Sequence, residues 1–182
     1  MARKVPKTDI FIQNVQRFFY KLTKYRNYVF IGIAGLIVIC AVAGYIKKTN
    51  FEKELVAKRL FYNALSDYTA GNIQRALESF KEITKSYGGT RVGARALYYL
   101  ANCYYYLGKF EEARESFEKV LKKTKDEIFC QGALLGIADC YLQEGKILEA
   151  KEYYEKVRKR FPGTPVAELA KRRLSLISTN VQ

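Results

Sequence analysis

The 182-residue chain contains no histidine and no tryptophan, and it has only three prolines and one methionine. Without histidine, every mechanism that needs an imidazole base, a histidine metal ligand or a Ser/His or Cys/His nucleophile pair is excluded. The scarcity of proline, beside long Glu-, Lys-, Ala- and Leu-rich stretches, favours helices, because sheet proteins need many turn residues and β-branched runs. We therefore expect an all-α protein that is not an enzyme.

Motifs that bind cofactors are missing from the sequence as well. It has no CxxC, no GxGxxG, no P-loop and no cluster of acids suited to a metal. Acids such as Glu111 and Glu112 are spaced for solvent rather than for paired proton transfer. The sequence predicts no cofactor and no metal.

The charge is unevenly distributed along the chain. The total is +14, and residues 1–27 carry seven Lys or Arg against Asp9 alone. After position 47 the basic residues alternate with glutamates along helical stretches, as at Glu115 and Lys119. That alternation is typical of a solvated helix face, so we expect no nucleic-acid partner.

One apolar run is long enough to cross a bilayer. From Tyr28 to Ile46 nineteen residues carry no charge, and a helix of that length reaches roughly 28 Å against a hydrocarbon core of about 30 Å. Tyr45 and Tyr28 stand where interfacial aromatic residues settle, and Lys47 follows. The sequence predicts a basic tail at 1–27, a transmembrane helix at 28–46 and a linker or helix start at 47–56. A buried core helix is the alternative.

A cleaved signal peptide is the more serious rival for this segment. Ala41, Val42 and Ala43 form an A-x-A-like site at the end of the apolar run. The 27 residues ahead of the run, and a run longer than the roughly 7 to 15 residues of a signal h-region, favour an uncleaved anchor.

The basic flanks of the apolar run bear on its orientation. Seven basic residues precede it and five follow closely, namely Lys47, Lys48, Lys53, Lys58 and Arg59. The short tail would have to cross the membrane in the opposite topology, whereas long following domains translocate with little regard to charge. We expect a single-pass protein of the inner (cytoplasmic) membrane, with a cytoplasmic N-terminus and an extracytoplasmic (periplasmic) domain.

Within the tail, apolar residues recur at helical spacing opposite basic ones. The apolar set is Phe11, Val15, Phe18, Leu22 and Tyr25, and the basic set is Lys7, Arg17, Lys21 and Lys24. A short helix with this pattern could lie in the headgroup layer of an anionic leaflet. A helix continuous with the spanning one is the alternative.

Three blocks of sequence repeat without gaps at intervals of 37 residues. Each block begins with glycine (Gly71, Gly108, Gly145), has alanine five residues later (Ala76, Ala113, Ala150) and an aromatic ring after four more (Phe80, Phe117, Tyr154). A small residue lies seven positions ahead of each glycine (Ala64, Ala101, Ala138). We expect the glycines to end a first helix in the left-handed conformation, and the alanines to let a second helix approach closely. Each unit is then a pair of helices.

At these residues the sequence resembles the tetratricopeptide repeat family, whose signature combines the glycine, alanine and aromatic positions with the upstream small residue. The resemblance implies an α-solenoid of three repeats at 57–93, 94–130 and 131–164, followed by a capping helix and tail at 165–182. Thr164 is suited to cap that helix and Pro165 to open it. The departures are the period of 37 against the usual 34 or so, and leucine where the family often has tryptophan.

The arrangement of basic tail, spanning helix and external repeats also resembles membrane-anchored tetratricopeptide proteins, exemplified by the ancillary subunit of the bacterial secretory translocon. That resemblance is architectural and implies a setting in protein export or assembly of the bacterial envelope.

Stacked repeats form an elongated groove whose inner wall comes mostly from the first helix of each pair. Placing the copies on that geometry predicts a partner-binding groove lined by Phe61, Leu65, Tyr68, Arg95, Tyr98, Asn102, Tyr105, Tyr106, Leu135, Asp139 and Leu142. Its tyrosines suit an interaction surface, and Arg95, Asn102 and Asp139 could fix a peptide backbone or terminus. The alternative is that several of the tyrosines only pack between helices.

The leading hypothesis is a non-catalytic scaffold that binds a protein partner, either a peptide segment or an envelope or translocon subunit, beside the membrane. The alternative is a permanent structural subunit of an envelope complex with no exchangeable ligand. The sequence leaves the partner's identity and self-association of the array open. Cys103 and Cys140 are equivalent positions in neighbouring repeats, and packed helices stand about 8 to 10 Å apart. We therefore expect small core residues rather than a disulfide.

Overall fold

The computed structural model describes residues 7–179. Over that range the chain forms eight α-helices and no strand, which confirms the all-α prediction. Residues 1–6 of the basic tail and 180–182 of the C-terminal tail lie outside the described residues, as do the side chains of Lys7, Leu22 and Lys24. The chain divides into two units, residues 1–49 and 50–182.

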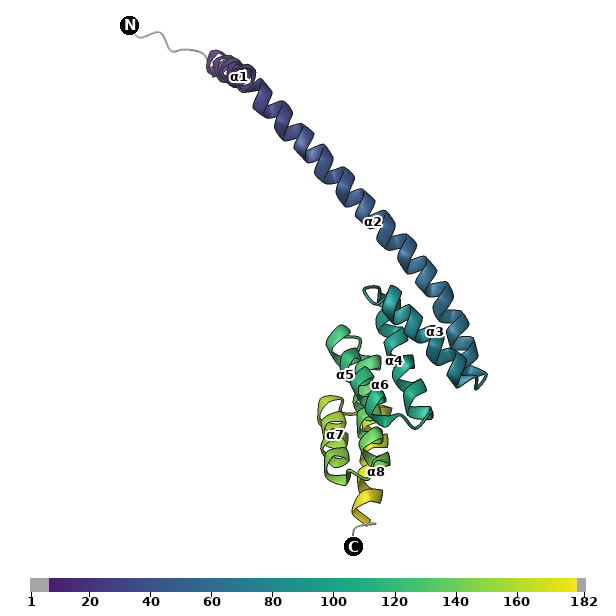
Figure 1. Ribbon diagram of the computed structural model, residues 1–182. Coiled ribbons are helices and arrows are strands. Elements are labelled where there is room, and N and C mark those ends of the chain that lie inside the picture. The colour runs from purple at the N-terminus through teal and green to yellow at the C-terminus, as the bar shows by residue number, and fades with distance from the viewer. Residues whose placement is uncertain (1–6, 180–182) are drawn as a thin grey trace. The chain divides into compact units, whose positions relative to one another are not determined.

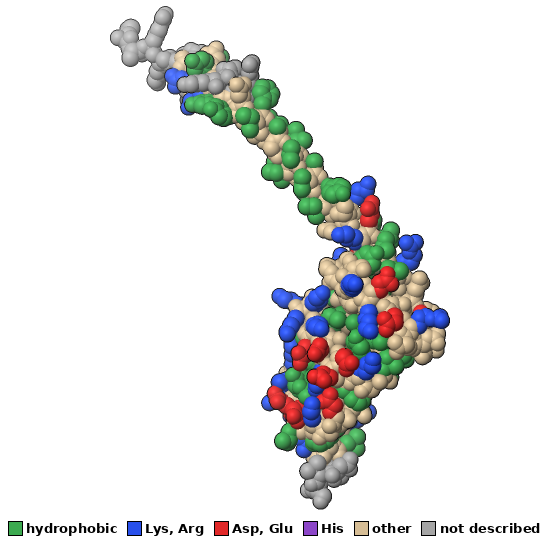
Figure 2. All heavy atoms as spheres, in the orientation of Figure 1, with side chains coloured by type: hydrophobic (Ala, Val, Ile, Leu, Met, Phe, Trp, Pro, Cys, Tyr) green, Lys and Arg blue, Asp and Glu red, His purple; other side chains and the backbone are tan. Residues whose placement is uncertain are grey.

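The first unit is built from two helices joined at one residue. Helix α1 spans Lys7–Lys24, Tyr25 forms a turn, and α2 spans Arg26–Thr69. The turn at Tyr25 therefore separates α1 from α2, and α1 is not continuous with the helix that contains the apolar run. The stretch from Phe30 onward is long and apolar enough to cross a membrane, with a mean hydropathy of 2.2 over its best window and none of that window buried. Figure 2 shows hydrophobic side chains along this stretch.

The second unit is an array of antiparallel helices (Figure 1). After the C-terminal part of α2, the helices are α3 (Ile73–Ser86), α4 (Arg91–Tyr106), α5 (Phe110–Lys123), α6 (Glu127–Gln143), α7 (Ile147–Arg160) and α8 (Pro165–Thr179). From α3 on, each helix packs against the next in the chain, and α4 contacts α6 as α6 contacts α8. The first helices of successive pairs thus form one wall, as expected for an α-solenoid.

The recurring glycines make the turns between paired helices. Gly71, Gly108 and Gly145 have φ of 82°, 73° and 74°, the left-handed conformation predicted for them. Gly163 has φ of 77° and makes a fourth such turn ahead of α8, outside the repeated block. A side chain at any of these positions would strain the backbone.

Small and aromatic residues of the repeated block fill the interior. Ala113 and Ala150 are fully buried, which fits close approach of paired helices at these positions. The aromatic rings of Phe80, Phe117 and Tyr154 are buried too. On the polar surface around this core, Lys, Arg, Asp and Glu are interspersed (Figure 2).

Side-chain caps fix where the first helices begin. The Thr90 hydroxyl accepts a 2.9 Å hydrogen bond from the Gly93 amide at the start of α4, and an Asp126 carboxylate oxygen accepts one of 3.1 Å from the Ile128 amide at the start of α6. Thr164 caps α8 through the Ala167 amide at 3.2 Å, as predicted. Helices α4 and α6 therefore begin ahead of the repeat boundaries proposed at 94 and 131.

Candidate partner-binding groove

A groove of about 990 Å³ lies where the N-terminal ends of α4 and α6 meet the second unit's part of α2. We call it the inner groove. Its lining residues are Glu54, Lys58, Gly89, Thr90, Arg91, Val92, Ala94, Arg95, Tyr98, Tyr99, Lys123, Thr124, Asp126, Ile128 and Phe129. Because Thr90 and Asp126 cap α4 and α6, the first residues of these helices lie together along the rim of the groove.

The charge of the inner groove is biased toward cations. Lys58, Arg91, Arg95 and Lys123 line it against two acids, Glu54 and Asp126. Within residues 7–179 the salt bridges of the chain leave all four cations unpaired with a carboxylate. Lys123 instead donates to the Gly88 carbonyl oxygen at 3.3 Å. A groove of this kind favours a ligand that carries negative charge.

The floor of the inner groove is aromatic. The Tyr98 ring lies 5.4 Å from that of Phe129 and 5.6 Å from that of Tyr99, centre to centre. The Arg95 guanidinium lies over the ring of Phe129 at 5.8 Å. Aromatic rings beside a cation present apolar area with a charged edge, a composition common in protein-binding surfaces.

Ten aromatic rings, between α2 and the start of α6, form a continuous network that we call the ring chain. It passes by contacts of 5.4 to 6.0 Å between ring centres and includes Phe61, Phe80, Tyr99, Tyr68, Tyr106, Tyr105, Phe110, Tyr98, Phe117 and Phe129. Such offset and edge-on pairs add stabilisation beyond the buried area of each ring.

A glycine in the third repeat makes room for one of these rings. Gly132 stands 37 residues after Arg95 in the repeat, and a Cβ atom there would lie 2.5 Å from the Tyr98 hydroxyl oxygen. Tyr98 can occupy the wall between α4 and α6 because the third repeat has no side chain at this position.

Two of the residues predicted to face the partner, Arg95 and Tyr98, line the inner groove. Arg95 is exposed, whereas Tyr98 is half-buried. Burial is the main reason that the pKa of the Tyr98 hydroxyl lies above its ordinary value.

The prediction for Phe61 is wrong. Its side chain is only 1% exposed and belongs to the core. Its ring lies 5.8 Å from that of Phe80 and 5.5 Å from that of Tyr99, and the Arg95 guanidinium covers it at 5.2 Å. The next first helix therefore takes the space in which a partner would have contacted Phe61.

Other predicted residues lie further along the first helices. Leu65, Tyr68 and Tyr105 are half-buried and pack against the core, and burial raises the pKa of both tyrosines. Tyr106 is 63% exposed. Asn102 is half-buried, and its side-chain amide donates to the Tyr98 carbonyl oxygen at 2.8 Å.

Asp139 is held by neighbouring helices rather than left for a partner. Its carboxylate accepts a 2.6 Å hydrogen bond from the Tyr154 hydroxyl of α7 and a charged one from Arg173 of α8. Burial raises the pKa of Asp139 while these two partners oppose the rise. Burial and the adjacent carboxylate likewise raise the pKa of the Tyr154 hydroxyl. We call Asp139, Tyr154 and Arg173 the closing triad.

The remaining predicted residues, Leu135 and Leu142, are half-buried and pack against the core cluster of the third repeat and α8. The predicted set is thus divided between the inner groove, the core and the closing triad.

Several residues that line the inner groove were not among those predicted from the sequence. Lys58 stands 37 residues before Arg95, so the repeat register alone could have found it. Arg91, Ile128 and Phe129 precede the proposed repeat boundaries, because the capped first helices begin earlier than the repeated block indicates.

The buried thiols are small core residues, as predicted for Cys103 and Cys140. They and Cys130 are buried and free, and burial raises the pKa of both Cys103 and Cys140 to about 12. In the described part of the chain, no group of cysteines and acids is placed to hold a metal ion.

Comparison with known proteins returns the same fold. The first tetratricopeptide repeat domain of Spaghetti (RPAP3), bound to the HSP90 peptide SRMEEVD, is 18% identical with a TM-score of 0.59, over 70% of this chain and 94% of that one. PcrH in complex with the chaperone-binding region of PopD is 21% identical with a TM-score of 0.62, over 71% and 96% of the two chains. PcrH is a protein of Pseudomonas aeruginosa.

A third solved structure is the second tetratricopeptide repeat domain of human RPAP3 with the HSP70 peptide SGPTIEEVD. It is 20% identical with a TM-score of 0.56, over 71% of this chain and 98% of that one. Among curated proteins no match is found. Residues 18–178 match the family model described as Tetratricopeptide repeat-like domain, and the chain belongs to that family.

Proposed function

We propose that the inner groove binds an extended, acidic segment of a partner protein. The chain is a tetratricopeptide repeat-like interaction scaffold, and the observation that supports this ligand is the set of cations in the groove without carboxylate partners. Arg91 and Arg95 suit carboxylates because a guanidinium can donate two parallel hydrogen bonds. Tyr98 and Phe129 offer rigid area for an apolar side chain between the acids.

The peptides named with two similar structures agree in chemistry with this ligand. SRMEEVD and SGPTIEEVD each end in two glutamates, a valine and an aspartate. The ends of both peptides combine acids with an apolar side chain, the combination that the cations and rings of the inner groove would accept.

We further propose that the apolar part of α2 anchors the array to a membrane. Its length and hydropathy support a span, and the basic tail supports a cytoplasmic N-terminus with the array on the extracytoplasmic side. The scaffold would then hold an exported protein, or an envelope or translocon subunit, beside the inner membrane.

A photo-crosslinker placed at either of two exposed residues tests the groove. Ile128 lines the inner groove and is 76% exposed, whereas Leu148 is the second residue of α7 and is 79% exposed. The matched exposure makes Leu148 a control for random collision. Full-length protein in its own membranes should crosslink one partner through position 128, and Arg91→Ala with Arg95→Ala should abolish that adduct.

The crosslinks also separate scaffold from permanent subunit. Adducts at 148 that survive the two arginine substitutions, with none at 128, would overturn the groove and favour a subunit packed through its outer helices. The exposed Leu148 on α7 is the observation that supports this second function, because a permanent partner could cover it.

A further inference from the structure

Helix α1 carries an uncovered apolar face. Phe11, Phe18 and Phe19 are 70%, 62% and 61% exposed, and Ile12 and Val15 are exposed beside them. At about 100° per residue these five positions fall within an arc of roughly 120° along one side of the helix. Surface helices of soluble proteins cover such a stripe with a core, so this face needs an apolar neighbour.

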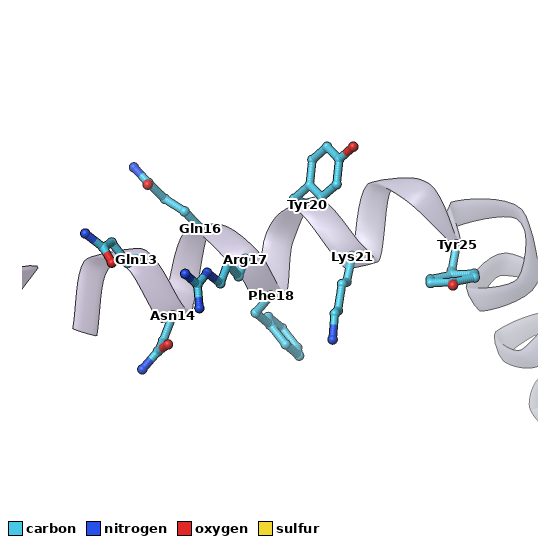
Figure 3. Close-up of a pocket in the computed structure, with 8 residues that line it drawn as sticks. All are labelled: Gln13, Asn14, Gln16, Arg17, Phe18, Tyr20, Lys21 and Tyr25. Atoms are coloured by element: carbon cyan, nitrogen blue, oxygen red, sulfur yellow. The ribbon is translucent and has the colours of Figure 1, made fainter. Parts of the chain in front are cut away.

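The rest of α1 is polar, and its charge lies on one flank. Figure 3 shows Gln13, Gln16 and Tyr20 on the side opposite Phe18, and Lys21 on the same side as Phe18. Arg17 and Lys21, one helical turn apart, line an open hollow of about 760 Å³ together with Phe18. Long basic side chains beside an apolar stripe can bury their stems and keep their charges at a polar boundary.

We propose that α1 lies flat in the headgroup layer of an anionic lipid bilayer, with its aromatic stripe in the acyl boundary and Arg17 and Lys21 against lipid phosphates. This inference rests on the membrane anchoring proposed above. Charge selects the lipid, since residues 1–27 carry seven cations and one acid. Continuity supports the location, because only Tyr25 separates α1 from the helix that carries the candidate span.

The turn at Tyr25 suits a change from a helix in the membrane plane to one that crosses it. The helix is interrupted there, with the Tyr25 amide donating to the Lys21 carbonyl oxygen at 3.1 Å. The ring of Tyr25 lies 6.4 Å from that of Tyr28, which places two amphipathic aromatic residues at the junction. A second copy of this chain is a poorer occupant of the apolar stripe, because pairing two such tails would bring their cations together.

The absence of tryptophan from the chain gives a direct test. Phe18→Trp places a single reporter on the apolar face, and Gln13→Trp places a matched reporter at an exposed position about 160° from the centre of that face. Full-length protein is reconstituted into vesicles of phosphatidylcholine with phosphatidylglycerol, and quenching by lipids brominated in the acyl chain is measured. We expect strong quenching and blue-shifted emission at position 18 and solvent-like emission at position 13.

Removing charge should release the helix without releasing the protein. Arg17→Gln with Lys21→Gln should shift the equilibrium between bound and free α1 by roughly 30-fold, at about 1 kcal/mol per basic residue near an anionic surface. Position 18 should then lose its quenching while the chain still floats with the vesicles. In vesicles of phosphatidylcholine alone, quenching at position 18 should likewise decrease, because the surface carries no negative charge.

Each other outcome overturns one proposal. Equal quenching at positions 13 and 18 would overturn the flat orientation. Blue-shifted emission at 18 without quenching would mean that protein covers the stripe, and it would overturn the lipid as occupant. A chain that does not float with vesicles, or that alkaline carbonate strips from them, would instead overturn the proposed anchoring.

Discussion

The second and third repeats differ in whether their charged side chains have partners within the protein. At the start of α4, in the second repeat, Arg91 and Arg95 line the inner groove without a carboxylate partner among the described residues. In the third repeat, Asp139 is satisfied by Tyr154 and Arg173. Repeats built on one pattern therefore offer a partner an open, basic end and a closed, neutralised one.

The difference follows from what packs beside each first helix. Helix α8 occupies the place after α6 and brings Arg173 to the Asp139 carboxylate. The capping helix thus neutralises a polar side chain of the repeat that it covers.

At the open end, tyrosines of the first helices should divide into structural and exposed ones. Tyr98→Ala removes a ring that contacts Phe117 and Phe129, and it should lower the free energy of unfolding by about 2 to 3 kcal/mol. Tyr106→Ala, at an exposed position, should cost less than about 1 kcal/mol. Urea unfolding of the two variants measures both, and equal losses would place Tyr106 in the core as well.

Arginine-to-methionine variants compare the two ends directly. Arg173→Met leaves a partly buried Asp139 with one partner fewer, which should cost about 1 to 2 kcal/mol after allowance for the exposure of the pair. Arg95→Met removes an exposed cation that lies over the rings of Phe61 and Phe129, and it should cost less than about 1 kcal/mol. If thermal melts shift by the same amount, the closing triad contributes nothing beyond a surface contact.

Thiol labelling should locate where Arg173→Met loosens the array. The thiols of Cys103 and Cys140 are buried with a pKa of about 12, so a maleimide reacts only when the structure opens locally. Cys140 follows Asp139 directly and should label several-fold faster in the variant, while Cys103 in α4 keeps its rate. Peptide mapping by mass spectrometry distinguishes them, and equal acceleration would indicate global unfolding instead.

The smallest effect concerns pH. Burial raises the pKa of Asp139 above its ordinary value of 3.8, so the folded chain holds this proton more tightly than the unfolded chain. The stability that it contributes is present below 3.8 and is lost as pH rises through the folded pKa. Asp139→Asn should remove that loss, which unfolding at about pH 4 and about pH 7 would reveal. If the free energies of unfolding of Asp139→Asn and the parent differ by the same amount at both pH values, the pKa of Asp139 is not raised.

The fold was predictable because its signals are local. Gly108, Ala113 and Phe117 each have one steric role that the spacing of 37 residues reveals. The positive φ of Gly108 and the burial of Ala113 and Phe117 confirm these roles. A turn that needs positive φ or a crossing that needs alanine depends on few neighbours.

The groove was only partly predictable because its lining depends on packing between repeats. Phe61 and Tyr98 hold the same place in the repeat, yet Phe61 is covered by Tyr99 and Arg95, and Tyr98 fills a gap left by Gly132. Arg173 could not be assigned to Asp139 because α8 lacks the repeated block, so its register could not be derived from the sequence.

The ring chain gives this protein an optical signature of its own. With no tryptophan in the sequence, near-ultraviolet circular dichroism of the array comes from its tyrosines and phenylalanines. Rings held at fixed mutual angles, such as Phe80 stacked on Tyr99 at 19° and Tyr98 nearly perpendicular to Tyr99 at 82°, give asymmetric surroundings to these transitions. That signal disappears when tertiary packing is lost while helices persist. The chain can therefore report a loosened core without any label.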